Sequence, residues 1–152
     1  MPEAPRKLLV TTDLSPESEC ACERACALAG PGATVTLLYV VDFGSHLPGG
    51  ALTLSEGARK SIWGEVRAKV EPKLQALRDR TLGACPSVEL ELVDGHGTAR
   101  TICDYAEEHG VDLIVIATHG NGMHRHLLGS VSERVVRHAT CDVLVVRSHP
   151  SA

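Results

Sequence analysis

The sequence predicts an α/β protein: one domain with an open five-stranded parallel sheet and helices on both faces. Two observations lead to this prediction. Five short runs of apolar and β-branched residues alternate with four segments of helical character along the chain. Most of these runs show little alternation of apolar and polar residues, which is typical of strands buried on both faces of a parallel sheet. Strands that alternate with helices pair most simply in parallel, through crossover connections.

Composition supports a single domain and excludes several classes of function. The 152 residues, 43% of them hydrophobic, suit one core, which aliphatic residues must fill because aromatic residues are few. The net charge of −4 offers no positive surface for nucleic acid or for an anionic membrane. No apolar run reaches the roughly 20 residues of a membrane span, and the first residues do not resemble a secretory signal. We expect one domain over residues 1–152, with its core at about 6–147, in the cytoplasm.

The first half of the chain predicts two strands and two helices. Ser15 is the expected N-cap of the first helix, with Pro16 at the first helical position. Pro72 falls inside the second helical pattern and is expected either to kink it or to end a segment of it. The predicted elements are strands at 7–12 and 33–41, a helix from 16 to about 30, and a helix at about 54–82.

The second half predicts three further strands and two helices. The run at 88–93 alternates in polarity and is expected near an edge of the sheet, whereas the apolar run at 111–117 is expected to be central. His109 and Gly110 are expected to end the helix between these strands, with the glycine in a left-handed conformation. The remaining elements are helices at 98–108 and 131–138 and a last strand at 142–146.

Ligands of such sheets bind beyond the carboxyl ends of the strands, where the strand order reverses. The segment after Ala117 is the strongest candidate, because it contains three glycines before a helix that starts near Ser130. Such a loop exposes backbone N–H groups to a phosphate, and the nearby Arg125 adds positive charge. An alternative requires no ligand: Ser130 and Glu133 form a capping box, and the glycines only shape a turn.

Three stretches resemble the universal stress protein family. They are VTTDLS at 10–15, LLYVV at 37–41, and LGSVSERV at 128–135 followed by CDVLVV at 141–146. The resemblance covers nearly the whole chain. It implies a Rossmann-like fold of the adenine nucleotide alpha hydrolase type and a regulatory, non-enzymatic role in the stress response. It also implies a homodimer formed through the last strand.

In the ATP-binding branch of that family, the loop follows the pattern Gly, two residues, Gly, nine residues, Gly, then Ser or Thr. The resemblance places this pattern on Ala117, Gly120, Gly129 and Ser130. The sequence departs from it twice, because Ala117 replaces the first glycine and only eight residues separate Gly120 from Gly129. An alanine limits positive φ values, and the shorter loop has less reach over the phosphates.

The resemblance implies that ATP, or ADP or AMP, binds here, with Mg²⁺ or Mn²⁺ on the phosphates. Asp13 would lie beside the ribose and base, the backbone of Val40 at the adenine edge, and Ser130 at the phosphates. The implied site consists of Thr11, Thr12, Asp13, Val40, Ala117, Thr118, His119, Gly120, Asn121, Gly122, Met123, Arg125, Gly129, Ser130, Val131 and Ser132.

Cysteines and histidines give weaker signals. The six cysteines of a chain without an export signal are expected to be reduced thiols. Cys22 and Cys26 share one helical face and could bind a metal, although packing is the favoured interpretation. His124 and His126, with His119, have no Cys or carboxylate in the same loop to complete a zinc site. We therefore expect no metal site made of protein ligands.

Two other functions compete with a nucleotide-binding regulatory module. A slow ATP hydrolase of the same fold would need His119 or Asp13 as a general base, and the loop lacks a Walker lysine. An interaction protein would result if the shortened loop no longer admitted a nucleotide.

Overall fold

Strands and helices alternate along the whole chain in the computed structural model, which describes residues 3–43, 54–118 and 128–148. All nine predicted elements are present, and their ends differ from the predicted ends by about two residues at most. The elements are β1 (Lys7–Thr11), α1 (Pro16–Leu28), β2 (Thr34–Val41), α2 (Glu56–Thr81), β3 (Val88–Asp94), α3 (Thr98–Glu108), β4 (Leu113–Ala117), α4 (Ser130–His138) and β5 (Asp142–Val146).

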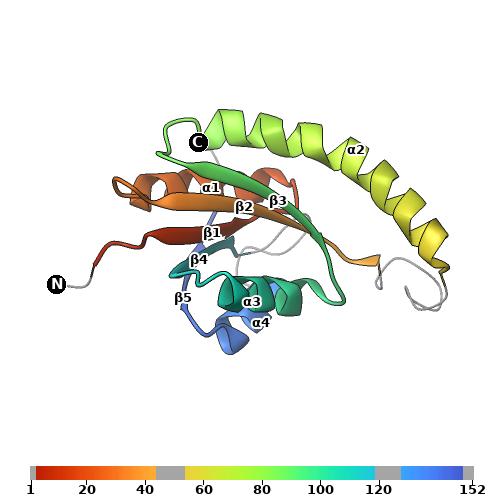
Figure 1. Ribbon diagram of the computed structural model, residues 1–152. Helices are drawn as coiled ribbons and strands as arrows, with labels where there is room; N and C mark the ends of the chain where they lie inside the picture. The colour runs from red at the N-terminus through yellow and green to blue at the C-terminus, as the bar shows by residue number, and fades with distance from the viewer. Residues whose placement is uncertain (1–2, 44–53, 119–127, 149–152) are drawn as a thin grey trace.

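The five strands form one parallel sheet in the order β3-β2-β1-β4-β5 (Figure 1). β1 lies at the centre, where Leu9 is in register with Thr36 of β2 and with Ile114 of β4. The strand order reverses between β1 and β4, so a crevice is expected at the carboxyl ends of these two strands. The prediction of a parallel sheet is confirmed. β3 is an edge strand, as its alternating sequence predicts, and β4 is an internal strand.

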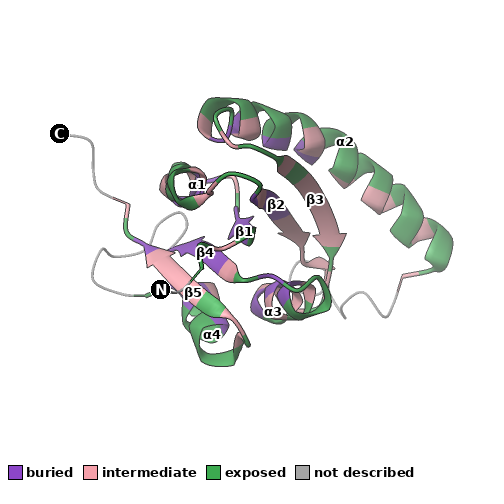
Figure 2. Cartoon of the chain, turned by 60° about the vertical axis from the view of Figure 1, so that its left-hand side comes forward, coloured by how far each residue is buried: buried purple, intermediate pink, exposed green. Residues whose placement is uncertain are grey.

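Each face of the sheet is covered by two helices (Figure 2). On one face α1 and α2 pack on side chains such as Leu8 and Leu37, and on the other α3 and α4 pack on Leu9 and Ile114. Alternate residues of β1 therefore belong to different cores. This explains the continuous apolar runs of the internal strands, because both faces are buried.

Helix ends follow the predicted chemistry in two places. Ser15 is the N-cap of α1 and Pro16 is its first residue, as expected. The side chain of Ser15 makes no capping bond and donates instead to the Asp13 carboxylate. His109 is the C-cap of α3, and Gly110 has φ 63°, the left-handed conformation that glycine adopts at little cost.

Pro72 does not end α2, which continues through it from Glu56 to Thr81. Figure 1 shows this helix curving over the sheet, with its first turns beyond the strands. The buried residues of α2 all lie in its second half, at Val70, Leu74 and Leu77. None of the helices within the described ranges has the length and apolar content needed to cross a membrane.

Candidate functional site

A cavity of about 280 Å³ lies at the carboxyl ends of β1, β2 and β4, next to the first residues of α3 and α4. It is the place where the strand order predicts a ligand crevice. One wall is apolar and consists of Leu38 and Val40 from β2, Ile102 from α3 and Ile116 from β4. The rest of its lining is mainly polar.

Every described residue of the implied site lines this cavity, except Thr118. These residues are Thr11, Thr12, Asp13, Val40, Ala117, Gly129, Ser130, Val131 and Ser132. Three segments far apart in the sequence therefore meet at one place. The other members of the implied site, His119, Gly120, Asn121, Gly122, Met123 and Arg125, lie outside the described residues.

The cavity also contains residues that the sequence did not single out: Ser18, Leu38, Thr98, Ile102 and Ile116. Thr98 could have been found, because it begins the helix that follows the carboxyl end of β3 after a short loop. Ser18 lies in the first turn of α1 and is buried. Nothing in its local pattern distinguishes it from an ordinary small helix residue.

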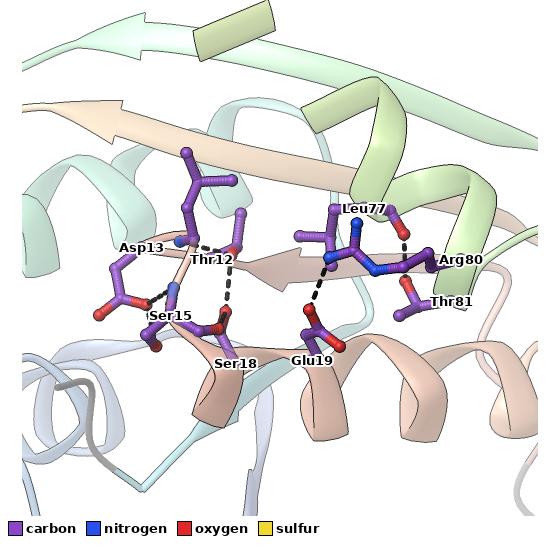
Figure 3. A network of polar contacts seen from close by, with 9 residues as sticks. Thr12, Asp13, Ser15, Ser18, Glu19, Leu77, Arg80 and Thr81 are labelled. Carbon is purple, nitrogen blue, oxygen red and sulfur yellow. Dashed lines mark hydrogen bonds and ion pairs between the residues drawn. The ribbon is translucent and has the colours of Figure 1, made fainter. Parts of the chain in front are cut away.

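The turn between β1 and α1 holds Asp13 by hydrogen bonds (Figure 3). The backbone N–H and the hydroxyl of Ser15 both donate to Oδ1 of Asp13, the N–H at 2.9 Å. Thr12 Oγ1 accepts from the N–H of Leu14 at 2.9 Å and lies 2.7 Å from Ser18 Oγ. Asp13 also contributes to the raised pKa of Tyr39, although burial of the phenol is the larger cause.

At the corner between β4 and α4, the hydroxyl of Ser132 makes hydrogen bonds to the backbone of the protein itself. This hydroxyl is buried and donates to the carbonyl of Ala117 at 2.6 Å, with a second contact to the carbonyl of Thr118 at 3.1 Å. The N–H of Gly129 also donates to Thr118, at 2.7 Å. Since a hydroxyl has only one proton, Ser132 is not available to donate to a ligand through its side chain.

The capping box of Ser130 and Glu133 is not formed. Gly129 is the N-cap of α4 and Ser130 is its first helical residue, so Glu133 lies one position too far along to reach the cap. Glu133 pairs instead with Arg137, at 2.6 Å. The hydroxyl of Ser130 therefore does not cap the helix, and the first N–H groups of α4 have no intrahelical acceptor.

A larger groove of about 830 Å³ lies elsewhere, between α2, the end of β3 and α3. No residue of the implied site lines it. Arg59 in its wall pairs with Asp94 at 3.5 Å, and Arg100 pairs with Asp104 at 3.7 Å. We take the smaller cavity as the candidate site, because the strand ends converge only there.

The expectation of six free thiols is wrong for Cys26 and Cys85, which form a disulfide with their Cα atoms 5.4 Å apart. They are 59 residues apart in sequence and meet because the end of α1 packs near the turn after α2. The pairing also removes Cys26 from any metal site shared with Cys22. Burial raises the pKa of Cys22 to about 12, so that thiol is neutral. Cys20, Cys22, Cys103 and Cys141 are free.

The part of the chain that the structure describes contains no cluster of metal-binding side chains. Among residues 3–43, 54–118 and 128–148, no three His, Cys, Asp or Glu side chains are grouped to hold a metal ion. The histidines at 119, 124 and 126 lie outside these ranges.

The fold and the cavity together define the class: an α/β protein with a ligand-sized pocket where the order of its parallel strands reverses. The model of the universal stress protein family matches residues 5–147, and the chain belongs to that family.

Similar proteins cover nearly the whole chain. The putative universal stress protein SH1215 of Staphylococcus haemolyticus is 33% identical over 146 residues, which span 94% of this chain and 85% of the relative. The structure of the universal stress protein UspA from Lactobacillus plantarum is 29% identical with a TM-score of 0.75, covering 96% of this chain and 100% of that one. A universal stress protein in complex with cAMP is 25% identical with a TM-score of 0.69, covering 95% and 98%.

Proposed function

We propose that this universal stress protein binds an adenine nucleotide, ATP, ADP or AMP, in the cavity at the carboxyl ends of β1, β2 and β4. In this proposal it acts as a regulatory module of the stress response and not as a rapid enzyme. A cytoplasmic location is part of the proposal.

One observation carries the proposal: the cavity combines an apolar wall, a fixed carboxylate and an open helix N-terminus. The wall of Leu38, Val40, Ile102 and Ile116 suits the faces of a purine base. Asp13 is an acceptor for the ribose hydroxyls. This division of apolar and polar surface matches the parts of a nucleotide.

The start of α4 suits the phosphates. Its first N–H groups lack intrahelical acceptors, and the positive end of the helix dipole favours an anion. Ser130 lines the cavity and supplies a hydroxyl that the capping box does not use. Mg²⁺ or Mn²⁺ would be held mainly by the phosphates, as is common for magnesium nucleotides. A relative that binds cAMP supports the choice of an adenine nucleotide.

Binding without rapid turnover fits the charges of the cavity. Asp13 is the one titratable side chain among the described residues that line it. Rapid phosphoryl transfer requires positive groups that stabilise the transferred phosphate. No described lining residue carries positive charge. The loop also lacks a Walker lysine, so we expect ATP hydrolysis to be slow.

The test compares Gly129→Glu, at a buried glycine, with Gly64→Glu, which adds the same charge at an exposed glycine away from the cavity. Gly129 is the N-cap of α4 at φ −64°, which other residues adopt freely, so a glutamate there places negative charge at the phosphate position. Gly64 lies on the exposed side of α2, where an added Cβ meets nothing within 4 Å. Nucleotide at a hundredfold over its dissociation constant should stabilise the wild type and Gly64→Glu by about 2.7 kcal/mol. Gly129→Glu should lose this shift.

The alternative of an interaction protein is favoured by Ala117 and by the shortened loop. It predicts that ATP, ADP and AMP all fail to shift the thermal unfolding of the wild type at millimolar concentration with magnesium. It also predicts that purified protein releases no adenine nucleotide when it is denatured. A shift in thermal unfolding caused by an adenine nucleotide, or an adenine nucleotide released on denaturation, would contradict this alternative.

A further inference from the structure

The turn that joins β1 to α1 contains an unusual backbone conformation. Leu14 has φ 65°, and it is the only non-glycine residue with positive φ in the described part of the chain. A side chain disfavours this left-handed region. The turn therefore needs interactions that hold it, and Figure 3 shows that they come from Thr12, Ser15 and Ser18.

The hydroxyl protons of this turn can be assigned one by one. Ser18 Oγ donates its single proton to the carbonyl of Ser15, at 2.8 Å. In the 2.7 Å contact between Thr12 Oγ1 and Ser18 Oγ, the proton must therefore come from Thr12. Thr12 Oγ1 in turn accepts the N–H of Leu14, at 2.9 Å. This series of hydrogen bonds runs from the Leu14 N–H through Thr12 and Ser18 to the Ser15 carbonyl.

These bonds lie in the interior of the protein. Thr12 has 8% of its surface exposed and Ser18 has 4%. A buried hydroxyl is expected to be hydrogen-bonded in any case, so satisfaction of the two hydroxyls alone would be an ordinary structural role. The difference here is that the series of hydrogen bonds connects two backbone groups on either side of Leu14, its own N–H and the carbonyl of Ser15. It thereby fixes the residue that has the disfavoured φ.

Asp13 lies directly before Leu14, and its orientation depends on the same turn. Both hydrogen bonds to its carboxylate, from the N–H and the hydroxyl of Ser15, reach Oδ1. Within the described residues no hydrogen bond reaches Oδ2, and Asp13 lines the cavity. One carboxylate oxygen is thus held by the turn while the other is available to a ligand.

We propose that Thr12 and Ser18 are positioning residues: they hold Leu14 in its left-handed conformation and thereby aim Asp13 at the hydroxyl groups of the bound nucleoside. The inference rests on the proposed function. It revises the implied role of Thr12, whose proton is directed to Ser18 and not to the ligand. Ser18 joins the site as a residue that acts through Asp13.

The first test replaces Thr12 by a residue of the same shape. Thr12→Val removes the donor and the acceptor, and it should weaken ADP binding by about tenfold in titration calorimetry, since that is the effect of roughly one hydrogen bond. Ser18→Ala should act in the same direction. The matched control is Thr36→Val, which alters a buried threonine on the neighbouring strand β2 outside the cavity. This control should bind ADP as the wild type does.

Two further variants separate positioning from general loss of structure. Leu14→Gly relieves the backbone preference, because glycine adopts positive φ at little cost; it should restore part of the affinity that Thr12→Val loses. In an Asp13→Asn background, Thr12→Val should have little further effect on affinity, because the group being positioned is already changed. A merely structural role predicts equal losses in both backgrounds and no recovery with glycine.

Amide hydrogen exchange tests the turn without any ligand. The N–H of Leu14 should exchange faster in Thr12→Val than in the wild type, while the amides of β2 keep their rates. Unchanged exchange at Leu14, unchanged ADP affinity in Thr12→Val, or equal losses in both Asp13 backgrounds would each overturn the positioning role. A wild type that binds no adenine nucleotide would instead overturn the proposed function, and the ligand-directed part of this inference would fall with it.

Discussion

Two serines at the start of α4, two positions apart, have opposite environments. Ser132 is buried and donates to the carbonyl of Ala117, whereas Ser130 is exposed and lines the cavity. Ser132→Ala should lower the free energy of unfolding by about 1–3 kcal/mol, because it leaves a buried carbonyl without this donor. Ser130→Ala should change stability by less than about 0.5 kcal/mol and weaken nucleotide binding. Urea unfolding and titration calorimetry measure the two effects, and equal stability of both variants would contradict this assignment.

Asp112 links the beginnings of β1 and β4 through its charge. Its Oδ2 accepts the N–H groups of Arg6 and Lys7, both at 2.9 Å, and these bonds lower the pKa of the carboxyl. A carboxyl with a lowered folded-state pKa stabilises the fold above its unfolded value of about 3.9, and this stabilisation is lost as pH falls through the folded pKa. Asp112→Asn should therefore be less stable than the wild type at pH 7.

The difference between Asp112→Asn and the wild type should begin to shrink below a pH of about 4, where the unfolded carboxyl is protonated, and should be lost as pH falls through the lowered folded pKa. Denaturant midpoints at neutral and acid pH measure this change. Asp104→Asn, at an exposed position on α3, is the control and should show no comparable difference at neutral pH. A stability difference for Asp112→Asn that is the same at both pH values would show that the charge is not responsible.

At the scale of elements, β5 is an edge strand with an apolar sequence, and the homodimer expected from the family would use it. Its outer edge has unpaired backbone groups that a second copy could pair. A lysine on such an edge opposes pairing, so Leu144→Lys should convert a dimer to a monomer in light scattering. Leu28→Lys, at an exposed leucine on α1, should leave the dimer intact. A wild-type monomer at micromolar concentration would contradict the prediction.

The sequence predicts elements and strand ends well because these depend on local chemistry. Apolar runs and caps such as Ser15 with Pro16 are enough to place the nine elements. The rule that ligands bind at strand ends then brings Asp13, Val40 and Ser130 to one cavity. Which hydroxyls are free to bind a ligand depends on contacts between residues distant in the sequence. The hydroxyl of Ser132 donates to the carbonyl of Ala117, 15 residues away, and only the folded corner reveals this. The same holds for the start of α4, where a one-residue shift removes the capping box.

At the scale of the whole molecule, two long-range links tie α1 to α2 and to the turn that follows it. Figure 3 shows the ion pair between Glu19 and Arg80, at 2.6 Å. The disulfide between Cys26 and Cys85 joins the end of α1 to that turn. Exposed ion pairs contribute about 0–1 kcal/mol, so the disulfide is expected to be the stronger link. It closes a loop of 59 residues, and the chain-entropy model predicts about 4 kcal/mol of stabilisation for a loop of this length.

This link predicts a thiol count and a stability difference. Protein purified without reductant should show four reactive thiols in denaturant, and six after reduction. Cys26→Ser or reduction should lower the free energy of unfolding by an amount of the order of 4 kcal/mol, because the unfolded chain regains the freedom that the cross-link removes. Cys103→Ser, at a free thiol on α3, is the control and should lack this effect. Six reactive thiols before reduction, together with equal denaturant midpoints with and without reductant, would show that the protein in solution does not contain the bond.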